Sequence, residues 1–330
     1  MTPSPGTYRV HVEQSSGLAG DEAFRHLLRE RRIDADVSYA ETDRPFDLLI
    51  ATRPSEDLLL SSASLQVLLV PLAGVPAPTW RALSSVPHVA VHTSHFNAQP
   101  VAEMALALML SAAKGIVAAD ARMRELDWTP RFVPPSSLLL AGRRALVVGY
   151  GAVGSRIARM CRALGVQVDA VRRSSGRHHS DDGVQVHPAG ALPDLLQGAD
   201  IVFVAVALNS ETKGLLGASE LALLHAESIL VSVSRPEIVD EQALFHALST
   251  RRLGGAALDI WRSEPASVDD AVGFSASPLP FHTLPNVVLS PHRAGGSGLP
   301  AVAQLRRRAV VDFIEEAAVG RPLSHREERP

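Results

Sequence analysis

Short apolar runs alternate with segments of helical character along most of the 330-residue chain. In the first third, strands are expected at 8–12, 35–39, 46–51, 65–70 and 89–91, with a helix at 21–32. Strands that alternate with helices require parallel connections. This third is therefore predicted to form a parallel α/β layer of its own.

The rest of the chain has the same alternation. A long helix rich in Ala, Leu and Met is expected at 100–125, and a proline-punctuated link at 126–140 follows it. Further strands are expected at 145–148, 166–171, 201–206, 229–233, 255–258 and 287–289. The expected helices are 153–164, 192–196, 219–224, 240–248 and 299–319. The stretch 265–285, rich in Pro and Ser, is too long for a plain connection, which favours a functional loop.

A glycine motif follows the strand expected at 145–148. Gly149, Gly151 and Gly154 have G-x-G-x-x-G spacing around Ala152 and Val153, and a helix and a second strand come next. In such a βαβ unit the first glycine makes the turn and the second lets a pyrophosphate approach the backbone. The third lets helix and strand pack closely, and the helix N-terminus faces the phosphates. The motif predicts dinucleotide binding, with a merely structural turn as the alternative.

The end of the second strand in this unit bears on which dinucleotide is preferred. An NAD site usually places Asp or Glu there to bind the ribose 2′-hydroxyl. Here Arg172 and Arg173 occupy that place, and Ser174 follows them. Guanidinium and hydroxyl groups can hold a 2′-phosphate, which a carboxylate would repel. NADP(H) is therefore favoured over NAD(H); the alternative is that the arginines only solvate a strand end.

Composition and charge narrow the class of protein. The chain is 46% hydrophobic and 20% charged, as ordinary globular proteins are, and is long enough for two domains. A formal net charge of −3 does not indicate a nucleic-acid-binding protein. With Cys161 alone, a disulfide framework and a multi-cysteine metal site are excluded, and no metal is expected. No signal-peptide pattern or long apolar stretch is found, so a soluble, cytoplasmic chain without a membrane partner is expected.

Three later segments carry chemically distinctive residues, each just beyond an expected strand. The segments are VSVSRPEIVDEQAL (231–244), GGAALDIWRSEP (254–265) and NVVLSPHRAGG (286–296). In order they supply Arg235, Glu264 and His292. Together with the glycine motif, they resemble the D-isomer-specific 2-hydroxyacid dehydrogenases, of the glyoxylate and hydroxypyruvate reductase kind. The resemblance extends to the run NAQPVAEMALALML from Asn97, similar to the family's interdomain helix, and to AGV at 73–75, similar to its substrate loop.

This resemblance implies a particular domain organisation. It implies two parallel-sheet domains of Rossmann-like and flavodoxin-like type, with the active site in the cleft between them. Residues 1–96 and 297–330 would form the flavodoxin-like substrate domain. Residues 97–296 would form an inserted, Rossmann-type NAD(P)-binding domain. A homodimer formed through the long helix is also expected from the resemblance.

The resemblance also implies roles for the distinctive residues. His292 would act as the general acid in reduction, while Glu264 would bond its other ring nitrogen and favour the protonated ring. Arg235 would grip the substrate carboxylate through two parallel bonds. The backbone amides of Ala73, Gly74 and Val75 would hold the far side of that carboxylate. Further cofactor-lining positions would be Ala207, Thr212, Ser234 and Asp259, the last near the nicotinamide carboxamide or, alternatively, only capping a turn.

The chain departs from the family pattern at several positions. Pro236 follows Arg235 where the family usually has Gly, which removes a donor and pushes Arg235 into an extended conformation. Ser232 stands where Asn is common, and Ala207 where Pro is frequent. The 265–285 loop separates Glu264 and His292 more than is usual. Two of its residues, Phe281 and His282, either reach the active site or merely pack the loop.

The leading interpretation is an NAD(P)H-dependent oxidoreductase that reduces a small 2-oxo acid to the D-2-hydroxy acid. Phosphite oxidation uses the same Arg, Glu and His set and remains open. Formate dehydrogenases carry Gln in place of Glu264, which argues against that activity. A nucleotide-sensing binding protein, like the corepressors related to this family, also remains open.

Overall fold

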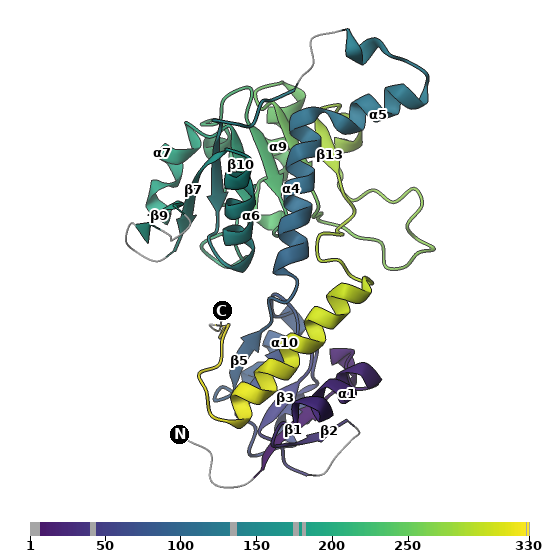
Figure 1. Cartoon of the computed structure of the whole chain (residues 1–330), viewed down its shortest axis with the longest axis vertical. Helices are drawn as coiled ribbons and strands as arrows, with labels where there is room; N and C mark the ends of the chain where they lie inside the picture. Colours follow the sequence, from purple (N-terminus) through teal and green to yellow (C-terminus); the bar gives the residue numbers. More distant parts are fainter. Residues whose placement is uncertain are drawn as a thin grey trace. The chain divides into compact units, whose positions relative to one another are not determined.

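The computed structural model describes residues 7–39, 44–132, 137–173, 178–179, 183–327 and 329. The chain divides into two compact units: unit 1 comprises Met1–Asn97 and Ser297–Pro330, and unit 2 comprises Ala98–Gly296. The first break therefore lies one residue beyond the boundary expected after residue 96. Each unit is built on a parallel sheet with helices between the strands, as predicted from the alternating pattern (Figure 1).

Unit 1 has a five-stranded sheet in the order β2-β1-β3-β4-β5, which is the flavodoxin-like order. All its pairings are parallel. The strands are β1 (Tyr8–Val12), β2 (Ala35–Ser38), β3 (Leu48–Ile50), β4 (Val67–Val70) and β5 (Ala90–Thr93). The helices are α1 (Glu22–Arg31), α2 (Glu56–Leu60), α3 (Ala77–Ala82) and α10 (Pro300–Ala318). Helices α1 and α10 pack against each other, and α10 covers β1, so the last helix completes a sheet made from the first residues (Figure 1).

Unit 2 has an eight-stranded sheet in the order β13-β12-β11-β10-β6-β7-β9-β8. The strands are β6 (Arg144–Val148), β7 (Gln167–Arg172), β8 (His178–His179), β9 (Gln185–Pro188), β10 (Ile201–Val204), β11 (Ile229–Ser232), β12 (Gly255–Leu258) and β13 (Val287–Leu289). The helices are α4 (Ala98–Lys114), α5 (Ile116–Arg124), α6 (Ala152–Ala163), α7 (Leu192–Leu196), α8 (Ala218–Leu221) and α9 (Glu241–Ser249). Among the strands that the structure describes in this sheet, only β8 pairs antiparallel, at the edge. The central order is that of a Rossmann sheet, whose strand order reverses between β6 and β10.

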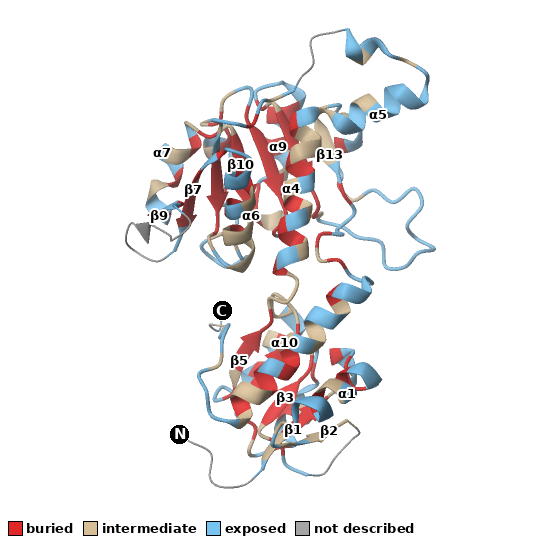
Figure 2. Ribbon diagram, in the orientation of Figure 1, coloured by how far each residue is buried: buried red, intermediate tan, exposed pale blue. Residues whose placement is uncertain are grey.

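Helices cover both faces of the unit 2 sheet. One apolar cluster joins the sheet to α4 and α6, and another joins it to α7, α8 and α9. All residues of β10, β11 and β12 are buried, as in parallel strands packed on both faces (Figure 2). This double burial is why the sequence shows continuous apolar runs at these strands.

The long helix expected at 100–125 is two helices. Gly115 adopts a left-handed conformation with φ of 61°, and α4 and α5 meet there at an angle of 66°. A residue with a side chain is disfavoured in that conformation, and glycine is not. Every residue of α5 is at least partly exposed, and the helix extends away from the sheet of unit 2 (Figure 1). In the described part of the chain no single helix has the length and apolar character of a membrane span; α4 and α5 meet those criteria only as a bent pair.

The segment after α10 lies along the edge strand β5. The backbone N–H of Thr93 donates to the His325 carbonyl (3.0 Å), and that of Glu327 donates to Val91 (2.8 Å). The Nδ1 of His92 bonds the Ser324 carbonyl at 2.7 Å. Residues 324–327 therefore cover the free edge of the unit 1 sheet.

Candidate active site

The glycine turn after β6 has the geometry of a phosphate cradle. Gly149 has φ of 101°, and a Cβ there would lie 2.7 Å from the backbone of Ala205 and Val206. A Cβ on Gly154 would lie 1.9 Å from the Gly149 carbonyl oxygen, so this glycine allows α6 to pack on the turn. A Cβ on Gly151 would meet nothing within 4 Å. The backbone at Gly151, where α6 begins, is therefore open to close approach, as the binding of a pyrophosphate at such a turn requires.

Other predicted cofactor residues gather at the carboxyl ends of the neighbouring strands. The Thr212 hydroxyl donates to the carbonyl of Ala207 at 2.7 Å, and the Ser234 hydroxyl donates to Val206. The first contact lies within the segment after β10, and the second joins that segment to the one after β11. Ligands of open α/β sheets bind at this edge, beside the point where strand order reverses.

The arginines predicted to decide between NADP(H) and NAD(H) lie at the same edge, at the end of β7. Arg172 is the last residue of β7, and both it and Arg173 are exposed. The backbone N–H of Gly149 donates to Val171 at 3.0 Å, which fixes the glycine turn beside the end of β7. Ser174 lies outside the described residues.

Arg235 lies three residues beyond the end of β11 and is exposed. Its backbone is extended, with φ of −137° and ψ of 143°, as expected for a residue before proline. Its Nη1 donates to the Ser234 carbonyl at 2.8 Å, which leaves the other guanidinium nitrogen donors for a ligand. Pro236 starts a short 3₁₀ turn (Pro236–Ile238), so the substitution is accommodated at the first position of a turn.

Glu264 and His292 are brought together although 28 residues separate them. The Glu264 Oε1 and the His292 Nδ1 form a hydrogen bond, and about half of each side chain is exposed. A carboxylate at Nδ1 fixes the ring's tautomer and leaves Nε2 as the ring nitrogen for proton transfer. Because β12 pairs with both β11 and β13, Arg235, Glu264 and His292 all follow adjacent strands of one sheet.

Asp259 follows β12 and is wholly buried. Its carboxylate accepts hydrogen bonds from Ser290 and from the backbone of Arg293 and Ala294. These are bonds to the segment that carries His292. Neither Ser290 nor Trp261, which also bonds this segment, was identified from the sequence. An indole or a hydroxyl near a strand end carries no distinctive motif.

The predicted substrate loop lies in unit 1. Ala73, Gly74 and Val75 form a turn after β4 and are partly buried. The backbone N–H of Ser94, after β5, donates to the Leu72 carbonyl at 2.9 Å and ties the two loops together. These loops lie at the carboxyl edge of the unit 1 sheet, where ligands bind in such folds.

The long loop before His292 is anchored at one end. Phe281 is buried and makes edge-to-face contacts with Phe245 and Trp261, at centroid distances of 5.2 and 6.1 Å. His282 is exposed. Of the two interpretations offered for Phe281, its burial among aromatic rings favours packing of the loop. Val268 and Val272, in the middle of the loop, are 88% and 95% exposed.

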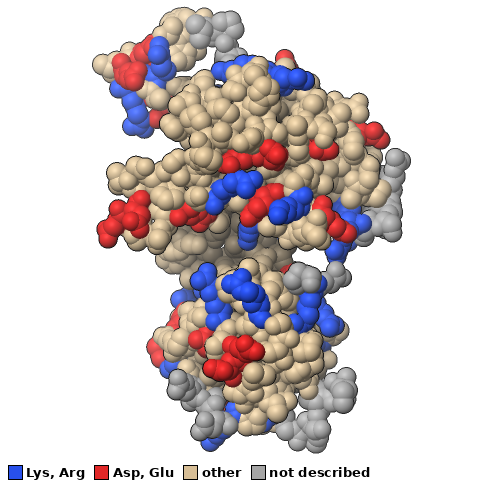
Figure 3. Space-filling view, turned by 180° about the vertical axis from the view of Figure 1, so that it is seen from behind, with Lys and Arg blue, Asp and Glu red and all other residues tan. Residues whose placement is uncertain are grey.

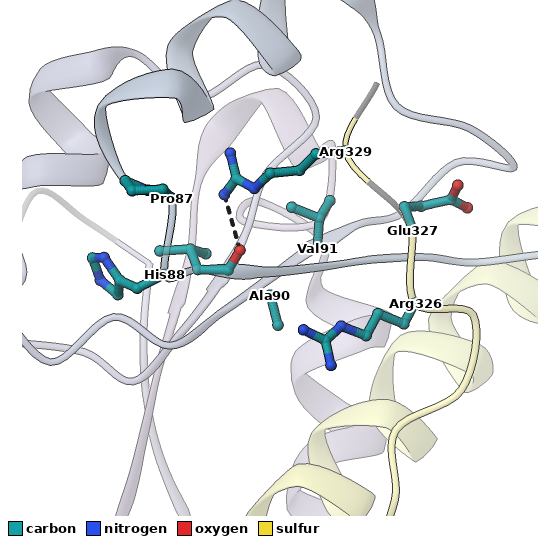
Figure 4. Close-up of a pocket in the computed structure, with 8 residues that line it drawn as sticks. Pro87, His88, Ala90, Val91, Arg326, Glu327 and Arg329 are labelled. Carbon is teal, nitrogen blue, oxygen red and sulfur yellow. Dashed lines mark hydrogen bonds between the residues drawn. The ribbon is translucent and has the colours of Figure 1, made fainter. Parts of the chain in front are cut away.

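A pocket of about 550 Å³ in unit 1 lies apart from these residues (Figure 4). It is lined by residues 87–91 and by Arg326, Glu327 and Arg329 of the C-terminal segment. The Arg329 guanidinium donates to the carbonyls of Leu83, Val86 and Val89. Because Arg329 donates to these backbone carbonyls, a structural role explains its place in the pocket.

The single cysteine is not suited to chemistry at neutral pH. Cys161 lies buried in α6, and burial raises the pKa of its thiol to about 12. The thiolate, which is the reactive form, is therefore scarce in the folded protein.

A Rossmann-type sheet with an open glycine cradle defines a dinucleotide-binding protein. Comparison with known proteins identifies the family: residues 106–294, more than half of the chain, match the family D-isomer specific 2-hydroxyacid dehydrogenase, NAD binding domain. The chain therefore belongs to this family, as its motifs predicted. The resemblance stated from the sequence is confirmed.

Curated relatives and solved structures agree with this assignment. A glyoxylate reductase from Korarchaeum cryptofilum is 34% identical over 204 residues, 60% of this chain and 57% of that protein. A D-3-phosphoglycerate dehydrogenase from Archaeoglobus fulgidus is 30% identical over 87% of this chain and 50% of its own length. The chain thus spans about half the length of such relatives. A 2-hydroxyacid dehydrogenase from Xanthobacter autotrophicus, solved with NADPH and MES, shares the fold with a TM-score of 0.77 at 23% identity, covering 98% and 99% of the two chains.

Proposed function

We propose that the chain is an NAD(P)H-dependent reductase that converts a small 2-oxo acid to the D-2-hydroxy acid, reversibly. The observation that carries this proposal is the hydrogen bond between Glu264 and His292, which makes an oriented proton donor. Arg235 follows β11, which pairs with β12, the strand that precedes Glu264, and its guanidinium is a carboxylate-binding group. The family of the chain supports the same reaction class.

Each side chain has a task that its chemistry suits. His292 gives a proton from Nε2 to the carbonyl oxygen of the substrate, and takes it back in the oxidising direction. Glu264 holds the ring through Nδ1 and stabilises the imidazolium. Arg235 binds the carboxylate through two parallel bonds and polarises the adjacent carbonyl, as a planar guanidinium can and an ammonium cannot. The backbone amides of Ala73, Gly74 and Val75, in unit 1 as the substrate domain, bind the far side of that carboxylate.

The nucleotide is held by unit 2 and, when bound, its nicotinamide supplies or accepts the hydride. Backbone amides at Gly151, Ala152 and Val153 face the pyrophosphate at the start of α6. Arg172 and Arg173, with Ser174, bind the 2′-phosphate and favour NADP(H) over NAD(H). Ala207, Thr212, Ser234 and Asp259 line the nicotinamide half of the cofactor.

Nicotinamide absorbance tests this proposal directly. NADPH and NADH are each paired with glyoxylate, hydroxypyruvate, pyruvate and phenylpyruvate, and phosphite is run in the oxidising direction. Turnover with a 2-oxo acid that is lost in Arg235→Gln is expected, because the uncharged amide cannot clamp a carboxylate. Turnover with phosphite alone would replace the proposal by phosphite oxidation. Nucleotide binding without any turnover would favour a sensing protein.

We also propose that the protein is a homodimer that uses the arm formed by α5 and the residues after it. Large apolar side chains are displayed there: Ile116, Val117, Leu126, Trp128 and Phe132 are 53–87% exposed. Such an apolar surface is unusual on a monomer and is typical of an interface. A second copy of the same arm is self-complementary to it in a twofold dimer.

The surface charges and the single cysteine concern two remaining expectations, the class of partner and the cellular compartment. Basic and acidic side chains are interspersed over the face of unit 2 seen in Figure 3, which does not form a basic stripe. The family of the chain supports a small acid as the partner, and this face of unit 2 offers no continuous basic surface to nucleic acid. The cytoplasm is the proposed compartment, supported by one buried and unpaired cysteine.

A further inference from the structure

Glu264 lies where a strand has ended and the long loop begins. β12 ends at Leu258, and the loop reaches its next helical turn only at Phe281–Thr283. The middle of the loop is open to solvent, as the exposure of Val268 and Val272 shows. The Glu264 carboxylate nevertheless bonds the His292 ring. Contacts made by the residues just before the loop must therefore hold Glu264 in place.

Trp261 joins this segment directly to the segment of His292. Its indole N–H donates to the Ser290 carbonyl at 2.8 Å. The same carbonyl accepts the backbone N–H of His292 at 3.1 Å. Trp261 lies three residues before Glu264 in the sequence, and Ser290 lies two before His292. The indole bond and the bond between the two side chains therefore close one ring that contains both Glu264 and His292.

The indole is packed as well as bonded. It makes an edge-to-face contact with Phe281, at a centroid distance of 6.1 Å, and Phe281 makes another with Phe245 of α9 at 5.2 Å. Phe281 itself is buried. A donor on a packed ring has few orientations to lose when it bonds, so its direction is well fixed. The three rings thus tie the residues on both sides of the long loop to one helix.

The segment that receives the indole bond has a strained backbone. The φ of His292 is 51°, in the left-handed region that residues other than Gly, Asn and Asp seldom adopt. Such conformations persist where the surroundings over-determine them. The indole bond fixes the carbonyl two residues before His292, and so restrains the backbone that sets the direction of the imidazole.

We propose that Trp261 is a positioning residue for the proton transfer. Its indole N–H keeps the segments of Glu264 and His292 in register across the long loop. This inference rests on the function proposed above for these two residues. Loss of the N–H, with an aromatic ring retained, should weaken the bond between Glu264 and His292. It should lower kcat without a matching rise in KM, because Arg235 is the group that binds the substrate carboxylate.

Trp261→Phe is the direct test. The phenyl ring still packs on Phe281, but it has no donor for the Ser290 carbonyl. Turnover of the 2-oxo acid is expected to fall about 10- to 100-fold, because the ring that gives the proton is no longer held in position. KM is expected to stay within about threefold. An unchanged kcat, or a change confined to KM, would overturn the proposal.

Glu241→Gln is the matched control for loosening of the same segment. Glu241 of α9 forms an ion pair with Arg262, the residue after Trp261, with Nε and Oε2 3.0 Å apart. The substitution weakens this link to α9 but leaves the indole bond intact. Its kcat should therefore stay within about twofold of the wild type. A loss equal to that of Trp261→Phe would show that general anchoring matters and not the indole, and the proposal would fail.

A double-mutant cycle tests whether the effect passes through Glu264. In a Glu264→Gln background the bond to His292 is already weakened. Trp261→Phe should then lower kcat by less than about threefold, well below its effect in the wild type. If the two losses multiply independently, Trp261 does not act through this bond.

The ring nitrogen resonances of His292 give a readout that needs no turnover. They are assigned by their absence from His292→Gln. In Trp261→Phe they are expected to move toward their positions in Glu264→Gln, because the same hydrogen bond is weakened. They should not move in Trp80→Phe, the same change in α3 of unit 1.

These resonances also separate the two proposals. Unchanged His292 signals in Trp261→Phe would refute the positioning role. Lack of turnover by the wild type with any 2-oxo acid would refute only the proposed function. If Trp261→Phe fails to fold, a benzothienyl side chain at position 261 gives the same test, because it keeps the shape of the indole and has sulfur in place of the N–H.

Discussion

The hydrogen bond between Glu264 and His292 is the residue-scale feature on which the proposed chemistry depends. Both side chains are about half exposed, so a small substrate can reach the ring. The bond at Nδ1 commits the ring to one orientation. Proton transfer by a positioned side chain contributes roughly 10²–10⁴-fold in rate.

His292→Ala should therefore lower kcat by about 10²–10⁴-fold with NADPH affinity little changed. Steady-state kinetics and calorimetry measure the two quantities separately. Near-normal turnover would remove His292 from acid–base chemistry. Glu264→Gln serves as a graded control, since it keeps a neutral partner for the ring and should lose less.

The two arginines beyond β7 give a second residue-scale prediction. Arg172→Asp combined with Arg173→Ala should weaken NADPH binding more than NADH binding, because a carboxylate repels the 2′-phosphate. The measurement is the dissociation constant of each nucleotide, compared between the variant and the wild type. Arg81→Asp, an exposed substitution on α3, is the control for reversal of a surface charge away from the nucleotide cradle. Equal weakening of both nucleotides would show that the arginines do not read the 2′-phosphate.

Candidate residues could be named from the sequence where a motif marks them. The glycines, Arg235, Glu264 and His292 have distinctive spacing or strand-end positions, and the structure brings Glu264 and His292 into a hydrogen bond, while their roles stay predictions. The hydrogen bonds of Asp259 were not predictable. They join it to residues 31–35 positions later, and neither end has a motif that specifies the partner.

At the scale of elements, the covered edge strand β5 makes the stability of unit 1 depend on pH. Burial lowers the pKa of the His92 imidazole below its usual 6.5, and this effect exceeds that of the hydrogen bond to the Ser324 carbonyl, which acts to raise the pKa. A lowered pKa means that the unfolded chain binds the proton more readily. The stability that unit 1 gains from the neutral His92 ring is therefore complete above about pH 6.5. It is lost as the pH falls through the pKa of His92 in the folded protein.

Thermal unfolding measured between pH 7.5 and 5 should show this loss. His92→Asn keeps a donor for Ser324 but does not titrate, so its melting temperature should fall less over the same range. His11 is also buried, with its pKa lowered by burial, and it titrates in both proteins. The difference between the two curves thus isolates His92. Identical curves would contradict the assignment.

Elements were predicted well where burial dictates a pattern, and poorly elsewhere. Strands such as β10 and β11 are buried on both faces, so their apolar runs are unambiguous. The short strands β8 and β9 and the short helices α2 and α3 were missed, because two to six residues carry too little periodicity. The break at Gly115 was missed because an isolated glycine is compatible with a continuous helix.

At the scale of the whole molecule, the exposed arm makes a prediction about assembly. Trp128→Ser with Phe132→Ser should convert a dimer to a monomer, because these side chains are 59% and 78% exposed and have the character of interface anchors. Sedimentation at several concentrations measures the state. Leu60→Ser, at an exposed leucine of unit 1, is the matched control. A wild-type monomer, or a dimer unaffected by the double change, would contradict the proposal.

The discontinuity of unit 1 also sets the order in which the molecule can be assembled during synthesis. Unit 2 is one continuous stretch, so all of its residues leave the ribosome before α10 does. The sheet of unit 1 is made first, yet α10, which covers β1, and the segment along β5 come last. Until they emerge, the apolar face under α10 and the edge of β5 are open to other chains. Unit 1 therefore cannot complete its packing until α10 has been synthesised, whereas unit 2 needs no later segment for its own.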